Sequence, residues 1–177
     1  IINNNLLMNE NFFTKPCKIS NPYTNIPFSI ANLYNIYFFI KERSFNMPYI
    51  FYLFFLQNFN IKKFVDKYEE ILNNEIIEKY TNSGTYFDEK NEYILEMLEY
   101  YDEYVTFTIH DDFPKDKLYE TFGDMLKHYI YSQFSIQLRR RFNEKKKLLD
   151  KIKTFSKYNT YYGRKYHTIT NNSRVFK

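Results

Sequence analysis

Residues 21–42, NPYTNIPFSIANLYNIYFFIKE, contain the clearest folding signal in the chain. The stretch opens with prolines and asparagines, a composition typical of turns, and becomes apolar and aromatic after Ser29. A serine hydroxyl at this position can accept a hydrogen bond from a free amide in the first turn of a helix. Phe28 and Leu33 have the spacing of a hydrophobic staple. The stretch therefore predicts a tight turn that leads into a helix ending at about Arg43.

This helix and the segment that follows it are the expected centre of the fold. The helix is apolar on nearly all sides, and such helices are usually central in their domain. The next apolar run, MPYIFYLFFL, extends from Met47 to Leu56, and Pro48 suits the first turn of a second helix. Ten apolar residues are too few for a membrane span, which needs about 20. We therefore expect residues 28–56 to be buried, and we do not expect a membrane partner.

Apolar residues recur at helical spacing through most of the remaining chain. Residues 11–28, which include the proline-rich turn, predict an ordered loop rich in Pro and Asn. Strand-like residues at VTFTIH allow a short extended piece near 105–109. The remaining predicted helices cover about 61–80, 88–107, 111–134 and 136–157. The expected fold is mainly α, an irregular bundle of about six helices with an ordered Pro/Asn-rich N-terminal loop.

A chain of 177 residues is long enough for one domain with a sizeable core. We expect residues 1–177 to form a single helical domain, with an irregular tail at 159–177. The sequence begins without Met, so we expect it to be the C-terminal part of a longer chain. With 19 Tyr, 19 Phe and only 3 Gly, the composition is rich in aromatic residues and favours helix over sheet.

The residues that usually carry catalysis or bind metals are scattered. Cys17 is the one cysteine, which excludes an internal disulfide, suggests a reducing compartment and fits a small buried residue better than a nucleophile. His110, His128 and His167 do not have metal-ligand spacing with it or with one another. The acids Asp111 and Asp112 beside His110 are explained by helix capping. Three glycines cannot build a phosphate-binding loop. We therefore expect no enzymatic activity, no metal and no cofactor.

Charge is distributed very unevenly along the chain. Residues 62–112 contain 5 Lys against 14 acids, a net charge of −9. Residues 135–165 contain 11 basic residues against Glu144 and Asp150, a net charge of +9. The two regions can attract each other within the fold, or the basic region can meet an anion from outside.

The basic segment 136–166 is the main candidate for a functional surface. Arg139, Lys146 and Lys153 recur every seven residues and share one face of the predicted helix, while Leu138, Phe142, Leu149 and Ile152 are expected on the opposite, packed side. Basic residues interleaved with aromatic ones can hold phosphates and stack bases. A solvated helix face or a membrane surface is an alternative. The candidate binding residues for a partner or a nucleic acid are Arg139, Arg140, Arg141, Lys145, Lys146, Lys147, Lys151, Lys153, Arg164 and Lys165.

Four segments of the chain together resemble a protein family. The opening stretch, then MPYIFYLFFLQNFNIKKF, DDFPKDKLYE and YGRKYH, occur in this order across residues 1–167. They are similar to segments of a family of nucleocytoplasmic large DNA viruses, the giant viruses, that has no established activity. The resemblance implies a viral origin and a location in the host cytoplasm or the virion. It implies no catalytic residues.

Together these observations predict a non-enzymatic structural or protein-interaction domain of a large DNA virus, intracellular and in a reducing environment. A protein partner is expected. The alternative is a nucleic-acid-binding protein that uses the basic segment 136–166. Binding to nucleic acid that depends steeply on salt distinguishes the second function from the first.

Overall fold

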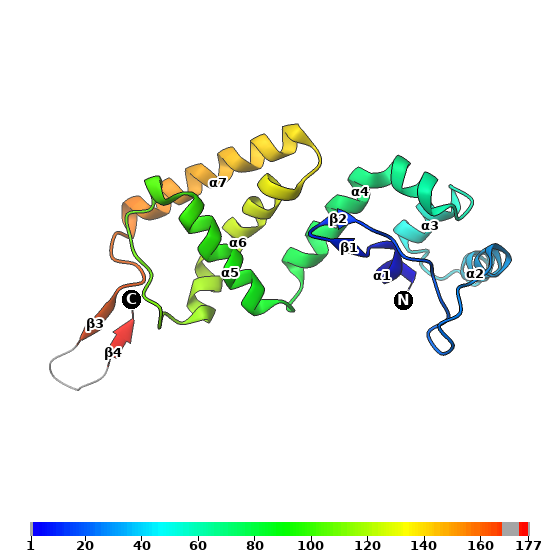
Figure 1. Ribbon diagram of the computed structural model, residues 1–177, viewed down its shortest axis with the longest axis horizontal. Coiled ribbons are helices and arrows are strands. Elements are labelled where there is room, and N and C mark those ends of the chain that lie inside the picture. Colours follow the sequence, from blue (N-terminus) through cyan, green and yellow to red (C-terminus); the bar gives the residue numbers. More distant parts are fainter. Residues whose placement is uncertain (1, 168–173, 177) are drawn as a thin grey trace. The chain divides into compact units, whose positions relative to one another are not determined.

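The computed structural model describes residues 2–167 and 174–176, with side chains described as far as residue 165. The chain is mainly α-helical, which confirms the expected fold class (Figure 1). It divides into two compact units, unit 1 from Ile1 to Lys79 and unit 2 from Tyr80 to Lys177. The single domain expected from the sequence stays a prediction, and each unit is described by itself.

Unit 1 combines a short hairpin with helices of very different length (Figure 1). β1 and β2 pair antiparallel, and the turn between them places Asn11 and Phe12 at positive φ. α4 runs across the boundary into unit 2 and is kinked at Tyr68. The elements are α1 (Ile2–Leu6), β1 (Asn9–Glu10), β2 (Phe13–Thr14), α2 (Ile30–Glu42), α3 (Tyr49–Phe55) and α4 (Ile61–Asn82).

The turn and helix start predicted from the opening stretch are confirmed. The Asn21 side-chain oxygen accepts a hydrogen bond from the Tyr23 backbone N–H at 2.9 Å, which closes the turn before α2. Ser29 is the N-cap of α2, and its Oγ accepts from the Asn32 backbone N–H at 3.2 Å. The second contact satisfies one of the backbone donors that a helix leaves without a partner in its first turn.

The core of unit 1 is made mostly of aromatic rings packed against one another. Phe51, Phe54 and Phe64 are buried, and the Phe54 and Phe64 rings meet edge to face with centroids 5.1 Å apart. The Tyr37 and Phe55 rings stack with centroids 3.7 Å apart and join α2 to α3. Aromatic pairs of this kind stabilise a core beyond the area they bury.

α2 is not the buried centre that the sequence predicted. Leu33 and Tyr37 are buried, but Phe38 and Phe39 on the same helix are 44% and 54% exposed. The physical reason is that α2 packs against α3 and the loop that follows it, and these contacts cover only one side of the helix. Residues 28–56 therefore include both the core and an exposed aromatic surface.

Unit 2 is built on three long helices (Figure 1). The acidic helix expected over 88–107 ends earlier, at Tyr100. The chain then makes one tight turn and is extended at Val105, where β-branched residues disfavour helix. The elements of unit 2 are α5 (Phe87–Tyr100), η1 (Asp102–Tyr104), α6 (Lys115–Phe134), α7 (Leu138–Tyr158), β3 (Lys165–His167) and β4 (Arg174–Phe176).

α6 packs against both α5 and α7 and so forms the centre of unit 2. Phe122, Leu126 and Ile130 at its core are buried. The segment before α6 joins α7 through Thr106, whose Oγ1 donates to the Ser156 backbone oxygen at 3.0 Å. These contacts fix the positions of α5 and α7 on either side of α6.

The chain after α7 folds back onto unit 2. The Tyr162 ring packs against Phe107, Phe122 and Phe155, and its hydroxyl donates to Thr121 Oγ1 at 2.9 Å. The tail expected to be irregular also contains an antiparallel pair of strands, β3 and β4. Packing of Tyr162 on this aromatic cluster explains why the chain directly after α7 has a defined position.

Lys90 is a buried cation at the start of unit 2. Its side chain is 1% exposed, and Nζ donates to the backbone oxygens of Thr81 and Ser83 at 3.2 and 2.5 Å. The amine also lies 5.5 Å from the ring centroid of Tyr80 and 5.4 Å from that of Tyr119. Lys90 therefore satisfies carbonyl groups at the end of α4 and stabilises the connection to α5.

Across the described residues, no helix is both long and apolar enough to span a bilayer.

Candidate interaction surface

α7 carries eight of the ten candidate binding residues. The Ser135 hydroxyl accepts a hydrogen bond from the Gln137 backbone N–H at 3.3 Å, and Gln137 is the N-cap of the helix. Leu148, Ile152 and Ser156 are buried and face α6. The helix is therefore anchored along its C-terminal half.

The N-terminal part of α7 is held by polar contacts. Arg141 Nε donates to the backbone oxygen of Ser132 at 3.2 Å. One turn further, Glu144 contacts His128 of α6, with Oε2 and Nδ1 2.5 Å apart. Arg141 and Glu144 thus occupy the side of the helix that Leu148 continues.

The sequence prediction for two apolar residues of α7 is wrong. Leu138 and Phe142 were expected on the packed side, but they are 77% and 68% exposed. The reason is the rotation of the helix, because Glu144 faces α6 through its contact with His128 and turns Leu138 and Phe142 away. Leu149 is half-buried and Ile152 is buried, as expected. A large apolar pair is therefore left in solvent in the first turns of a basic helix.

Most cations of α7 contact groups within unit 2. The Arg140 guanidinium lies 3.8 Å from the centroid of the Tyr131 ring, and Lys153 Nζ lies 4.4 Å from that of Tyr104. Lys145 Nζ donates to the Tyr100 hydroxyl at 3.4 Å. The ion pairs of this helix are Lys147 with Glu144 and Lys151 with Asp124.

Arg139 and Lys146 are the exception. Both are exposed, and among the described residues neither makes an ion pair, a side-chain hydrogen bond or a ring contact. They lie on either side of Phe142 in the sequence, and the helix places all three on one face. We define the basic–apolar face of α7 as Leu138, Arg139, Phe142 and Lys146.

The last two candidate residues lie beyond α7. The Arg164 guanidinium is 4.9 Å from the centroid of the Tyr161 ring. Lys165 in β3 pairs with Asp112, and its side chain is only 12% exposed. Lys165 therefore neutralises an acid of the segment before α6 and is poorly placed to bind an outside group.

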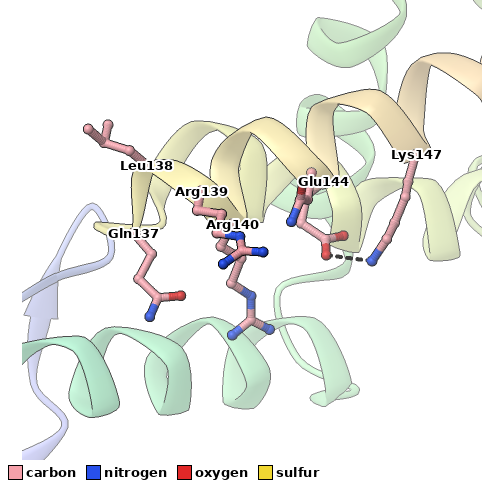
Figure 2. A pocket seen from close by; sticks show the side chains of 7 residues that line it. Gln137, Leu138, Arg139, Arg140, Glu144 and Lys147 are labelled. Atoms are coloured by element: carbon pink, nitrogen blue, oxygen red, sulfur yellow. Dashed lines mark hydrogen bonds and ion pairs between the residues drawn. The ribbon is translucent and has the colours of Figure 1, made fainter.

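A pocket of about 440 Å³ lies at the start of α7. Figure 2 shows the side chains of Gln137, Arg139 and Arg140 close to one another, and the Lys147 amine bonded to Glu144. Because Lys147 neutralises the carboxylate, the pocket presents mainly hydrogen-bond donors and suits an anionic group. The full lining is Gln137, Leu138, Arg139, Arg140, Asn143, Glu144 and Lys147.

Glu144 links this surface to α6. Burial raises the pKa of its carboxyl, but the hydrogen bonds from Lys147 and His128 outweigh burial and leave the pKa below its ordinary value of 4.5. The Glu144 side chain is 12% exposed, and that of His128 is 18% exposed. This contact stabilises the packing of α7 on α6 and so fixes the orientation of the basic–apolar face.

The candidate metal and catalytic residues do not come together. Cys17 is exposed, so the expected burial of this residue is wrong. The reason is its place in the chain after the β1–β2 hairpin, where the Sγ contacts only the Lys15 backbone oxygen at 4.0 Å. His128 contacts Glu144, and the His167 side chain lies outside the described ones. Within the described residues, no group of three His, Cys, Asp or Glu side chains can hold a metal ion.

Sequence reasoning found the cations of α7 but missed the exposed apolar pair. Periodicity alone offers two apolar stripes on this helix, one through Leu138 and Phe142 and one through Leu148 and Ile152. The Glu144–His128 contact decides between them, and no motif in the sequence indicates it. A partial signal was available, because Glu144 is the single acid among the first twelve residues of a basic helix.

Comparison with known proteins gives no relative for this chain: no family model, no curated protein and no solved structure matches it.

Proposed function

We propose that the protein is a non-enzymatic protein-interaction domain that binds its partner through the basic–apolar face of α7. One observation carries this proposal: Leu138 and Phe142 are mostly exposed, next to Arg139 and Lys146, which contact no side chain among the described residues. Large apolar side chains in solvent mark interaction sites when they are grouped. Aromatic residues and arginine are the types most enriched where binding energy is concentrated.

The residues that resemble a giant-virus family support a setting for this function. We place the protein in a large DNA virus, in the host cytoplasm or in the virion. Mass spectrometry of purified virions tests the second location directly. A protein absent from virions but present in infected cells would restrict the function to the cytoplasm.

The proposal is tested with a photo-cross-linking amino acid at position 142. We expect a cross-linked protein product at position 142, and none when the same amino acid replaces Tyr23, which is 95% exposed in unit 1. The product should be lost in the double variant Arg139→Ser/Lys146→Ser, which removes the charges and keeps the cross-linking amino acid at position 142. Equal cross-linking at positions 142 and 23 would show that proteins contact the chain without a specific binding site, which would contradict the proposal.

Nucleic-acid binding is the second candidate, because α7 has nine basic residues against two acids. A protein that meets six or more phosphates loses about 10³–10⁵-fold in affinity between 50 and 200 mM salt. We expect DNA and RNA to bind weakly and to dissociate at physiological salt. Tight binding at physiological salt that Arg139→Ser/Lys146→Ser abolishes, and that Leu138→Ser/Phe142→Ser leaves intact, would favour this candidate.

A further inference from the structure

The outer side of α5 is an acidic counterpart to the basic–apolar face of α7. Ile94, Met97 and Leu98 are buried, which turns the opposite side of α5 to solvent. On that side Leu95 is 48% exposed and has acids before and after it in the helix. We define the acidic–apolar face of α5 as Asp88, Glu92, Leu95 and Glu99, all of which are exposed.

The two faces have the same spacing. On α5, Leu95 follows Glu92 by three residues and precedes Glu99 by four. On α7, Phe142 follows Arg139 by three residues and precedes Lys146 by four. Seven residues of helix span about 10.5 Å, so the two acids and the two cations are the same distance apart along their helices. Each face thus contains two like charges with an exposed apolar residue between them.

These faces are available for binding. Glu99, like Arg139 and Lys146, has no side-chain partner among the described residues. Glu92 acts electrostatically on Lys115, whose amine is bonded to Asp88 at 2.6 Å. α5 and α7 are both fixed to α6, and the exposure of Leu95 and Phe142 shows that they do not cover each other within one copy.

We propose that the acidic–apolar face of α5 on one copy of the chain binds the basic–apolar face of α7 on another copy. This inference rests on the proposed function and names the partner as a second copy. Charge complementarity supports this occupant. α5 and η1 together hold seven acids and one lysine, a net charge of −6, whereas α7 holds nine basic residues and two acids, a net charge of +7.

Matching spacing gives the contact a defined register. In a parallel alignment of the two helices, Glu92 meets Arg139 and Glu99 meets Lys146, while Leu95 packs on Phe142. The contact joins different surfaces of the two copies, so it is heterologous, and the pair keeps one free face of each kind, one on each copy. Association therefore continues into a ring or an open chain.

The test is sedimentation velocity of the full chain, treated with nuclease, across a range of concentrations and at two salt concentrations. We expect association that weakens as salt rises, because exposed ion pairs are screened. Glu92→Lys/Glu99→Lys and Arg139→Glu/Lys146→Glu should each weaken it at least about tenfold, since like charges then face each other. Mixing the two variants in equal amounts should restore association, because each reversed face then meets its complement.

Two controls separate this result from a general charge effect. Lys62→Glu/Lys63→Glu makes the same charge change at exposed positions of unit 1 and should not alter association. Phe142→Ser keeps every charge and should weaken association, which covers the case in which a charge-reversed variant does not fold.

Each alternative outcome contradicts the inference. A parent chain that stays monomeric at low salt overturns it, and so does a mixture that fails to restore association. Association that disappears with nuclease treatment indicates a nucleic acid as the partner. If the parent is monomeric but position 142 still cross-links to a different protein, the second-copy inference fails while the proposed function stands.

Discussion

The two units use aromatic residues in different ways. In unit 1, residues 19–60 contain only three charged residues, Lys41, Glu42 and Arg43, and the rings pack mainly on one another. Rings contact cations in both units, but more often in unit 2, as Tyr131 does with Arg140 and Tyr104 with Lys153. Aromatic content therefore does not decide whether a ring forms a core or a surface.

What decides is the number of neighbours that an element has. α6 packs against two long helices, so its apolar stripe is buried. α2 packs against α3 and the loop after it, and its outer rings stay in solvent even though its sequence is more apolar. The unit with fewer charges thus exposes more aromatic surface, and the unit with more charges keeps a well-covered core.

The largest effect should come from removing a buried ring of unit 1. Phe51 is fully buried, and Phe51→Ala should lower the free energy of unfolding by about 3–5 kcal/mol, because it removes packing and leaves a cavity. Phe39→Ala is the matched control, since that ring is 54% exposed. Denaturant unfolding measures both. Equal losses would show that α2 is covered in solution.

A smaller effect is expected from glycine substitutions in unit 2. Gly163 has φ of 75°, and a Cβ there would lie 2.9 Å from the Ile109 Cα. Gly163→Ala should therefore cost about 1–3 kcal/mol. At Gly123, within α6, an added Cβ would make an ordinary contact with the Tyr119 ring at 3.5 Å. Gly123→Ala should stabilise by about 0.5–1 kcal/mol, because alanine favours helix.

Opposite shifts in the urea midpoint of these two variants would support the assignment of a close backbone contact at Gly163. If Gly163→Ala leaves the midpoint unchanged, the tail does not pack on residues 108–110 as the structure places it.

The sequence was sufficient to predict the helices, because each has a local signal. Ser29 marks the start of α2, and apolar spacing marks α6 and α7. It was not sufficient to predict which side of a helix is covered. That depends on contacts between residues far apart in the chain, such as Tyr37 with Phe55 and Glu144 with His128.

The same holds for the candidate surface: its residue types could be predicted, but their exposure could not. The cations could be read from composition, including the repeat of Arg139 and Lys146. The exposure of Phe142 could not, because an apolar residue at helical spacing is normally assigned to the core. The acidic face of α5 was visible as charge, but its match to α7 needs the knowledge that both helices are fixed to α6.

The next prediction concerns the contact that orients α7. Glu144→Gln should destabilise the protein at pH 7 by about 1 kcal/mol, because it weakens hydrogen bonds to Lys147 and His128 in partly screened surroundings. The folded pKa of Glu144 is below 4.5, so its contribution is present above that pH and is lost as the pH falls through the folded pKa. The difference between parent and variant should therefore shrink below pH 4.5.

Glu120→Gln is the control for this pH dependence. Glu120 pairs with Lys117 at 2.7 Å, but both side chains are well exposed. Exposed pairs contribute little to stability, so unfolding of this variant should match the parent across the pH range. A deficit for Glu144→Gln that stays constant down to pH 3 would mean that the carboxylate charge is not what stabilises the contact.

Two arginines at the start of α7 should differ in their effect on stability, because only one of them makes a hydrogen bond within the fold. Arg141→Ser removes the hydrogen bond to the Ser132 backbone oxygen and should cost about 1 kcal/mol. Arg139→Ser should change stability by less than about 0.5 kcal/mol, as is usual for a surface residue without partners. Thermal unfolding compares the two. A larger loss for Arg139→Ser would show that this side chain is held within the fold and is not free for a partner.

The smallest effect is expected at Cys17. The thiol is exposed, and its contact with the Lys15 backbone oxygen at 4.0 Å is weak. A serine has nearly the same size and can keep this contact, so Cys17→Ser should change the free energy of unfolding by less than about 0.5 kcal/mol. Cross-linking at position 142 should also be unchanged, since Cys17 belongs to unit 1 and the proposed binding faces belong to unit 2. Loss of cross-linking in a variant that unfolds like the parent would contradict this division of roles and would make unit 1 part of the binding site.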